Sequence, residues 1–417
     1  MTITLDDVLA ARELLAGIAR KTPVEGSRPL SAAVGGPVHL KCENLQRAGS
    51  FKIRGAYTRM SRLDVGQRAG GVVAASAGNH AQGVALAASM LGIQATVFMP
   101  HGAPIPKVQA TRGYGATVRF AGATLDEALV EATAFEAETG AVLIHPFDHP
   151  DIVAGQGTCG LEILEQVPDV RTIVVCTGGG GLLAGIALAV KSTRPGVRVV
   201  GVQAERAAAY PASLAAGHPV RLAEMATMAD GIAVGLPGQV PFELVRAHVD
   251  AICTVSEESL SGALLLCLER AKLVVEPAGA AAVAAIMDNP GAFEPPVVAV
   301  LSGGNIDPQL MLRVLRYGLV AAGRFLSLTV RVPDRPGNLA ALLATLAAAG
   351  ANVLEVSHAR IAHTLGLHEV DIAIELETRG EPHAQEVADR LRTEGYAVTR
   401  LDQAAEPRLL REMGIES

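Results

Sequence analysis

The sequence predicts an α/β protein with an open, mostly parallel sheet architecture, followed by a separate ferredoxin-like βαββαβ module. Its 417 residues exceed what one hydrophobic core usually organises. Through most of the chain, near-continuous apolar runs alternate with helical stretches, which is typical of parallel strands covered on both faces. Beyond Gly323, apolar and polar residues alternate instead, as in half-buried strands.

The strands of the first part are predicted from apolar runs that end at turn residues. These runs lie at residues 72–75, 94–99, 172–177, 198–203 and 297–301. A helix is expected over 81–91, where Gly92 ends it, and another opens at Gly181 and runs to Val190. Ligands of open parallel sheets bind beyond the carboxyl ends of the strands, so the chemistry is expected in the loops that follow them.

The C-terminal module is predicted from alternating strands and two helices in the order βαββαβ. Strands are expected at 326–332, 353–358, 369–376 and 397–401, and helices at 338–349 and 382–393. The polar tail that follows predicts no regular structure.

Composition argues against several classes of partner. The formal net charge is −7 and aromatic residues make up only 3%, with no basic run, so no nucleic-acid partner is expected. The five cysteines are scattered without a C-x-x-C pair, which favours reduced thiols over disulfides or a zinc site. With neither a signal peptide nor a run long enough to span a bilayer, we expect a cytoplasmic protein without membrane contact.

The first candidate loop is S-F-K-I-R-G-A, residues 50–56. A lone lysine is usually an exposed surface residue. Lys52, however, stands between apolar neighbours and before what we expect to be a turn of small residues. Partial burial there would lower the pKa of its amine, as Schiff-base chemistry requires.

The second candidate loop is S-A-G-N-H, residues 76–80, between a strand and a helix. Its small residues would expose backbone N–H groups at a helix N-terminus, where a carboxylate or phosphate can bind. Asn79 could offer its amide to a ring oxygen. An ordinary N-cap turn explains the same residues equally well, and His80 alone is more typical of a structural histidine.

Two glycine-rich loops follow predicted strands. Four glycines, 178–181, precede Leu182. Because ordering four consecutive glycines costs much conformational entropy, the run indicates close approach of the backbone to a phosphate. It matches neither a Walker loop nor G-x-G-x-x-G, so no nucleotide is implied. In S-G-G-N, residues 302–305, with E-P-A-G-A upstream at 276–280, the Ser302 hydroxyl could bond a ring nitrogen. A plain strand-to-helix turn remains an equal alternative for this last loop.

In this order, the motifs S-F-K-I-R-G-A, S-A-G-N-H-A-Q-G, G-G-G-G-L, E-P-A-G-A and S-G-G-N resemble the threonine dehydratase branch of the fold-type II, or tryptophan-synthase β-like, pyridoxal-phosphate enzymes. The resemblance covers about residues 5–320. It implies that Lys52 holds pyridoxal 5'-phosphate covalently, with Phe51 beside its ring, Asn79 on its phenolate oxygen and Ser302 on its pyridine nitrogen. The implied phosphate site is Gly178, Gly179, Gly180, Gly181 and Leu182. The implied substrate carboxylate site is Ser76, Ala77, Gly78, Asn79 and His80.

The resemblance further implies a threonine ammonia-lyase that makes 2-oxobutyrate and ammonia and feeds isoleucine biosynthesis. Serine or 3-hydroxyaspartate are alternative substrates, and a catalytically inactive amino-acid sensor is an alternative of another class. Serine racemases usually carry a hydroxyl residue where Ala77 stands, which argues against racemisation. Cation-binding relatives carry carboxylates where Gln203 and Ala209 stand, so no metal site is expected.

The C-terminal module resembles an ACT domain. The resemblance implies an effector site at Asp334, Arg335, Pro336, Gly337, Asn338 and Leu339. Isoleucine or valine is the expected effector, and a homo-oligomer, dimer or tetramer, is expected; a purely structural oligomerisation module is the alternative. We expect a catalytic domain at 1–322, with a smaller lobe at about 49–150 inserted in a larger one, then the ACT domain at 325–402 and a tail at 403–417. A single such module leaves a biosynthetic or a catabolic role open.

Overall fold

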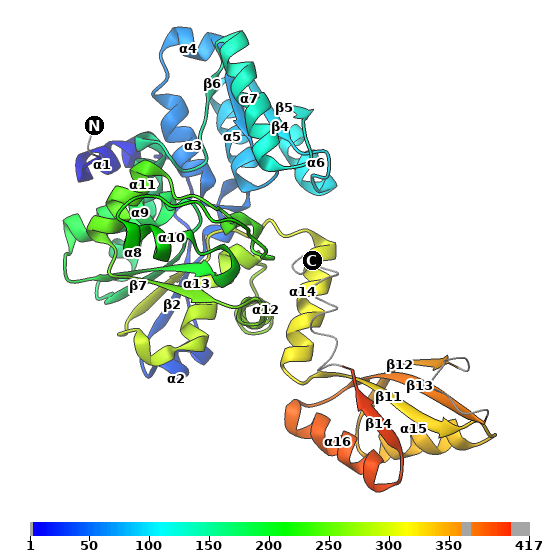
Figure 1. Ribbon diagram of the computed structural model, residues 1–417. Coiled ribbons are helices and arrows are strands. Elements are labelled where there is room, and N and C mark those ends of the chain that lie inside the picture. The colour runs from blue at the N-terminus through cyan, green and yellow to red at the C-terminus, as the bar shows by residue number, and fades with distance from the viewer. Residues whose placement is uncertain (1–2, 360–367, 402–417) are drawn as a thin grey trace. The chain divides into compact units, whose positions relative to one another are not determined.

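The computed structural model describes residues 3–359 and 368–401, so the expected tail at 403–417 lies outside the described residues. The chain divides into two compact units, Met1–Asp307 and Pro308–Ser417. The first unit has two lobes, each built on its own sheet (Figure 1). Among the described residues, no helix combines the length and the apolar character needed to cross a membrane.

The larger lobe is built on a six-stranded sheet in the order β1-β2-β10-β7-β8-β9. All neighbouring strands are parallel except β1, which runs antiparallel to β2. The strands are β1 (Val24–Gly26), β2 (Val38–Lys41), β7 (Thr172–Cys176), β8 (Arg198–Ala204), β9 (Ala251–Val255) and β10 (Val297–Val300). The three strands predicted in this lobe are therefore confirmed to within a residue, because each apolar run is buried on both faces.

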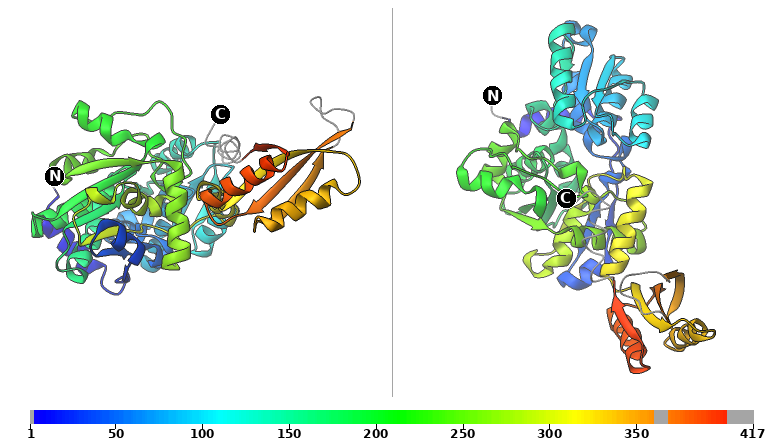
Figure 2. Two further views of the ribbon diagram at one scale, coloured as in Figure 1. Left: turned by 90° about the horizontal axis from the view of Figure 1, so that it is seen from below. Right: turned by 45° about the vertical axis from the view of Figure 1, so that its right-hand side comes forward.

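Helices cover both faces of this sheet (Figure 2). They are α1 (Leu5–Leu14), α2 (Arg28–Val34), α8 (Pro150–Gln166), α9 (Gly181–Thr193), α10 (Ala209–Ala216), α11 (Gln239–His248), α12 (Glu257–Leu266) and α13 (Pro277–Asp288). α8 and α9 approach closely because glycines face each other. A Cβ on Gly185 would overlap the backbone of α8, and one on Gly157 would lie 2.9 Å from the Gly185 carbonyl.

The smaller lobe has a parallel four-stranded sheet in the order β5-β4-β3-β6. Its strands are β3 (Val72–Ala75), β4 (Ala95–Met99), β5 (Thr117–Phe120) and β6 (Val142–Leu143). Its helices are α3 (Lys52–Ser61), α4 (Val65–Gly70), α5 (Asn79–Leu91), α6 (Ile105–Gly113) and α7 (Leu125–Thr139). The predicted strands are confirmed, and the predicted helix begins two residues earlier, at Asn79.

The second unit begins with α14 (Pro308–Ala321) and continues as the predicted βαββαβ module, which is confirmed. Its elements are β11 (Phe325–Pro333), α15 (Asn338–Ala348), β12 (Asn352–Ala359), β13 (Glu369–Glu377), α16 (Glu381–Thr393) and β14 (Ala397–Arg400). The strands form an antiparallel sheet in the order β12-β13-β11-β14. Alternate residues of β11 and β13 are buried against the two helices, as their period-two pattern predicts.

Candidate active site

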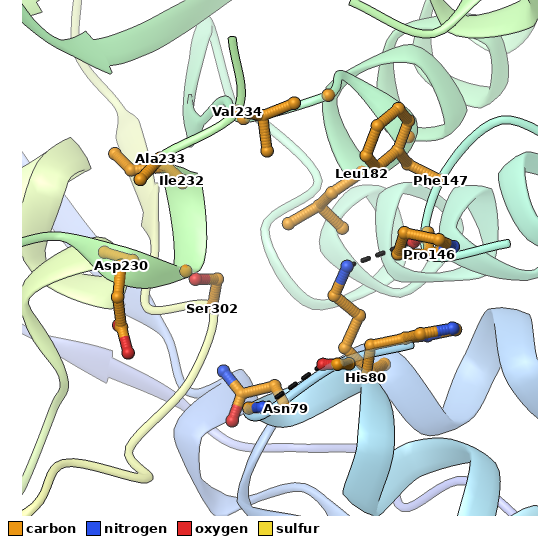
Figure 3. A pocket seen from close by; sticks show the side chains of 18 of the residues that line it. Asn79, His80, Pro146, Phe147, Leu182, Asp230, Ile232, Ala233, Val234 and Ser302 are labelled. Atoms are coloured by element: carbon orange, nitrogen blue, oxygen red, sulfur yellow. Dashed lines mark hydrogen bonds between the residues drawn. The ribbon is translucent and has the colours of Figure 1, made fainter. Parts of the chain in front are cut away.

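A cavity of about 270 Å³ lies between the two lobes of the first unit, beyond the carboxyl ends of β3, β7 and β10 (Figure 3). Every site residue that the sequence predicts for this unit lines it. These residues are Phe51, Lys52, Ser76, Ala77, Gly78, Asn79, His80, Gly178, Gly179, Gly180, Gly181, Leu182 and Ser302. Four loops that lie far apart in the sequence therefore meet at one place.

Lys52 is the first residue of α3 and lines the cavity. Its Nζ donates a hydrogen bond of 3.1 Å to the Pro146 carbonyl oxygen and lies 5.1 Å from the centre of the Phe51 ring. Burial lowers the pKa of Lys52 to about 8, partly opposed by the nearby acidic groups Cys176 and Glu276. Part of this amine is therefore neutral near physiological pH, as covalent chemistry requires.

The residues after Lys52 correct one expectation, because they continue α3 and form no turn. This places Arg54 in the interior, where only 1% of its side chain is exposed. Its Nε and one Nη each contact the buried Glu43 carboxylate at 2.8 Å, and its other Nη contacts Glu162 at 2.7 Å. Although burial opposes ionisation, the Arg54 guanidinium holds the pKa of Glu43 below its ordinary value. This ion-pair network anchors the start of α3, and therefore the backbone that carries Lys52.

The loop at 76–80 leads from β3 into α5. The Gly78 N–H donates to Ser76 Oγ at 3.1 Å, and Gly78 precedes the helix without a side-chain cap. The first N–H groups of α5 therefore lack intrahelical partners and can receive an anion. His80 has another role: its Nε2 lies 2.7 Å from the Ile144 carbonyl oxygen, and burial lowers the pKa of His80 to about 3. Its ring is therefore neutral, with the proton on Nε2.

The glycine loop at 178–181 connects β7 to α9. Gly180 has a φ of 99°, and a Cβ added there would overlap the Tyr210 hydroxyl. A Cβ on Gly179 would overlap the Phe147 ring. Gly180 precedes α9 without a side-chain cap, so the helix N-terminus presents bare N–H groups and its dipole to the cavity. These glycines are therefore required both by their neighbours and by the backbone conformation.

Ser302 follows β10 and is only 2% exposed. Its Oγ lies 3.1 Å from Cys176 Sγ, which donates to it, and its carbonyl oxygen accepts a bond of 3.1 Å from the Phe51 N–H. Burial raises the pKa of the Cys176 thiol to about 11, so the thiol keeps the proton that it donates. The Ser302 hydroxyl then retains its own hydrogen for a partner in the cavity.

Side-chain hydrogen bonds hold Asn79 on both sides. Its Nδ2 donates to Glu276 Oε1 at 2.6 Å, and its Oδ1 accepts from Asn305 Nδ2 at 2.8 Å. Burial, together with Asp230, raises the pKa of Glu276 to about 7, against the opposing effect of Lys107. The sequence drew attention to the motifs that carry Glu276 and Asn305 but assigned neither side chain a role.

Sequence reasoning missed the wall formed by residues 230–234 and one bridge between the lobes. Lys107, on α6 of the smaller lobe, lies 2.5 Å from Asp230 of the larger lobe. Asp230, Ile232, Ala233 and Val234 line the cavity on the side opposite Pro146 and Phe147 (Figure 3). This segment contains only a short 3-10 helix, Asp230–Ile232, and no glycine run, so no local pattern indicated it.

Gln203 and Ala209, the positions considered for a metal, take part in hydrogen bonds of the fold; the Ala209 carbonyl oxygen accepts from Ser213 Oγ at 2.7 Å. Gln203 Nε2 donates to the Thr177 carbonyl oxygen at 3.2 Å, and its Oε1 accepts from the Tyr210 N–H at 2.9 Å. Within residues 3–359 and 368–401, no group of three or more His, Cys, Asp or Glu side chains is placed to hold a metal ion. The expected absence of a metal site stays a prediction.

The predicted effector segment, 334–339, forms the turn between β11 and α15 in the second unit. Residues 334–337 are exposed, and Gly337 adopts a φ of 94° directly before the helix. The Asn338 side chain donates to the Pro333 carbonyl oxygen at 2.9 Å, which fixes the turn. The segment therefore presents an accessible helix N-terminus.

Comparison with known proteins adds independent evidence. The family model described as pyridoxal-phosphate dependent enzyme matches residues 15–303, and the ACT domain model matches residues 326–393. The chain belongs to the pyridoxal-phosphate dependent enzymes. The cofactor implied by the five motifs is thereby confirmed, as is the architecture of a two-lobed parallel-sheet domain with a C-terminal ACT domain.

Among relatives of this pyridoxal-phosphate dependent enzyme, the L-threonine ammonia-lyase of Thermotoga maritima is 47% identical, over 95% of this chain and 99% of the relative. The crystal structure of a threonine deaminase from T.th. is 43% identical, with a TM-score of 0.70, covering 73% of this chain and 99% of that one. A maize serine racemase structure is 36% identical, with a TM-score of 0.72, covering 76% and 98%.

The residues present in this pyridoxal-phosphate dependent enzyme fit its cofactor. The aldehyde needs a partly neutral amine, which Lys52 supplies with a pKa of about 8. The phosphate needs bare N–H groups beside a backbone without Cβ atoms, which the glycine loop supplies at the start of α9. Both features lie in the same cavity, so one ligand can reach them together.

Proposed function

We propose that the protein is a threonine ammonia-lyase, a carbon–nitrogen lyase that converts L-threonine to 2-oxobutyrate and ammonia by β-elimination of water. The observation that carries this proposal is the partly neutral Lys52 amine in the same cavity as the uncapped, glycine-lined start of α9. The Thermotoga maritima relative, named L-threonine ammonia-lyase and aligned over nearly the whole of both chains, supports the choice of reaction.

Each predicted site residue receives a role in this proposal. When bound, pyridoxal phosphate supplies an aldehyde for amines and a ring that withdraws electrons from the substrate Cα. Lys52 would hold the aldehyde carbon, and Phe51 would pack beside the ring. Asn79 would donate to the phenolate oxygen and Ser302 to the pyridine nitrogen. The phosphate would rest on Gly178, Gly179, Gly180, Gly181 and Leu182.

The substrate would be oriented by the loop at 76–80 and deprotonated by Lys52. The uncapped N–H groups at the start of α5 would receive its carboxylate, and the small residues Ala77 and Gly78 leave room for that approach. Once the Lys52 amine is free, its lowered pKa suits it to take the Cα proton near neutral pH. Ser302 offers a hydroxyl rather than a carboxylate, so it does not keep a proton on the ring nitrogen, and elimination is favoured.

The charges around the cavity support a substrate with an uncharged side chain. Ile232, Ala233 and Val234 give one wall an apolar surface. Among the described residues, no arginine lines the cavity, although a second substrate carboxylate is commonly bound by arginine. Lys107 is already paired with Asp230. Threonine and serine therefore fit better than 3-hydroxyaspartate.

Racemisation is a less suitable reaction for this site. It requires an acid or base on the face of the Cα opposite Lys52. Ala77 lines the cavity within the loop at 76–80 and has no group that could exchange a proton. The similarity to the maize serine racemase therefore supports the fold of this chain more strongly than it supports racemisation as its reaction.

The finer assignments also belong to this proposal. We infer a cytoplasmic homo-oligomer, a dimer or tetramer, with domains at 1–322 and 325–402. The ACT domain would bind isoleucine or valine at 334–339 and regulate a step of isoleucine biosynthesis. The exposed turn before α15 and the match to the ACT domain model support an amino-acid site there.

The deciding experiment measures 2-oxo acid formation from L-threonine, L-serine and 3-hydroxyaspartate. Threonine should give the highest kcat/KM, serine a lower one, and 3-hydroxyaspartate the lowest. Lys52→Ala should abolish turnover with all three and also remove the absorbance band of the bound cofactor. A wild-type protein that binds pyridoxal phosphate but acts on none of them would refute the proposal and favour an amino-acid sensor.

A further inference from the structure

The orientation of the Asn79 amide is determined by a chain of hydrogen bonds through Asn305. Asn305 Nδ2 donates to the Ala48 carbonyl oxygen at 2.7 Å and to Asn79 at 2.8 Å. Because a carbonyl oxygen can only accept, the Asn305 atom that faces Ala48 must be the nitrogen. The same nitrogen faces Asn79, so the Asn79 atom on that side must be the oxygen.

The other side of Asn79 agrees with this orientation. Its second amide atom lies 2.6 Å from Glu276 Oε1. With a pKa of about 7, Glu276 is partly ionised near neutral pH, and in that form its carboxylate only accepts, which matches a nitrogen on this side of Asn79. The Ala48 carbonyl oxygen therefore specifies one amide orientation, and the ionised Glu276 carboxylate supports the same one. An amide NH₂ group has two hydrogens, so one N–H of Asn79 remains for the cavity.

The packing around this chain of hydrogen bonds depends on two glycines. Gly49 has a φ of 69°, and a Cβ there would overlap the Asn305 side chain. A Cβ on Gly303 would overlap the Glu276 carboxylate and lie 3.0 Å from Asn79 Nδ2. Two glycines thus admit the Asn305 and Glu276 side chains to the positions from which they bond Asn79.

We propose that Asn305 and Glu276 are positioning residues that hold the Asn79 amide with an N–H, and not its oxygen, toward the phenolate oxygen of the bound cofactor. The inference rests on the proposed function, in which Asn79 bonds that oxygen. An anionic oxygen is stabilised by a donor and destabilised by a facing carbonyl oxygen. The orientation of one amide therefore determines how much of the bound cofactor is in its phenolate form.

Exchanging the two positioning residues tests the inference without a change of net charge. In N305D/E276Q, the carboxylate introduced at position 305 accepts from the Asn79 nitrogen, and the amide introduced at position 276 donates to the Asn79 oxygen, so the Asn79 amide is reversed; the Ala48 carbonyl oxygen loses its donor in this variant, as it also does in N305A. In E276Q alone, the new amide can still accept from Asn79, and the orientation is kept. In N305A, one side of the chain is removed without reversal, at the cost of a cavity.

The readouts are the absorbance spectrum of the purified holoenzyme at one neutral pH and the dissociation constant for pyridoxal phosphate. The double variant should show the largest loss of the long-wavelength phenolate band and about tenfold weaker cofactor binding, the scale expected for one charge-assisted hydrogen bond. N305A should show a smaller change, and E276Q should retain the wild-type spectrum. Thermal unfolding followed by circular dichroism verifies that each variant is folded.

A purely steric role for Asn305 predicts the opposite order, with N305A the most affected and the isosteric exchange the least. That order would overturn the inference, as would a wild-type spectrum in N305D/E276Q. Should the double variant fail to fold, N305D replaces it in the comparison with N305A. Wild-type protein that binds no pyridoxal phosphate would instead refute the proposed function itself.

Discussion

The lowered pKa of Lys52 predicts how the reactivity of its amine changes with pH. With a pKa of about 8 instead of the ordinary 10.5, the neutral form is abundant at a much lower pH. Half a pH unit below the Lys52 pKa, roughly a quarter of the Lys52 amine is neutral, whereas about one part in a thousand of an ordinary lysine is neutral at the same pH. Because only the neutral amine is nucleophilic, Lys52 should be about two hundred times more reactive than an ordinary lysine at that pH.

Trace acetylation of the cofactor-free protein measures this directly. The protein is treated with a small amount of acetic anhydride over a pH series, and mass spectrometry quantifies the acetylated peptide that contains Lys52. The same peptide from the urea-unfolded chain is the matched control. In the folded protein, reactivity should rise about tenfold per pH unit and level off above a pH of about 8. In the unfolded chain it should still be rising two pH units higher.

Glu276→Gln provides the perturbation. The Glu276 charge raises the pKa of Lys52, so its removal should move the plateau to lower pH. A folded wild-type protein whose Lys52 reactivity follows the unfolded curve would refute the argument from burial. A plateau that shifts upward in Glu276→Gln would refute the assigned sign of the carboxylate's effect.

Three further predictions concern the rest of the chain. Gly180→Ala should weaken cofactor binding at least about tenfold, because Gly180 has a positive φ and the new methyl group would overlap the Tyr210 side chain. Gly196→Ala is the control, because a methyl group there has open space and should leave cofactor binding unchanged. Titration with pyridoxal phosphate compares the two variants. Arg54→Met should lower the free energy of unfolding by about 3–5 kcal/mol near neutral pH, as measured in urea. The pKa of Glu43 is lowered in the folded state, so this contribution exists above its unfolded pKa and fades as acid protonates the carboxylate; an equal loss at every pH would contradict the assignment. Isoleucine or valine should change the threonine rate curve and the thermal midpoint; if both are unchanged at saturation, the effector is another molecule.

The strands and the glycine loop could be predicted from sequence because their signals are local. A run such as 172–176 is apolar because both its faces are covered, and the four glycines after it have few other uses. The period-two pattern of β11 likewise reports the sheet in which it lies. In such segments, the pattern of a few consecutive residues is enough to predict the local structure.

The parts that could not be predicted depend on partners distant in sequence. From its neighbours in the sequence, Arg54 would be expected at the surface. It is buried because it pairs with Glu43 and with Glu162 on α8, which is distant in sequence. Asn305 and Glu276 act through Asn79, which lies 226 and 197 residues away in sequence. No local pattern encodes a hydrogen bond across such a separation, so the site residues were found while those that hold them in place were not.

Asn305 lies close to the point at which the chain divides into its two units. The first unit ends at Asp307, so only Ile306 and Asp307 separate Asn305 from α14, the first element of the second unit. A fully extended dipeptide adds about 7 Å of reach and little slack. The residue that positions the Asn79 amide therefore lies, along the chain, immediately before the point at which the first unit gives way to the second.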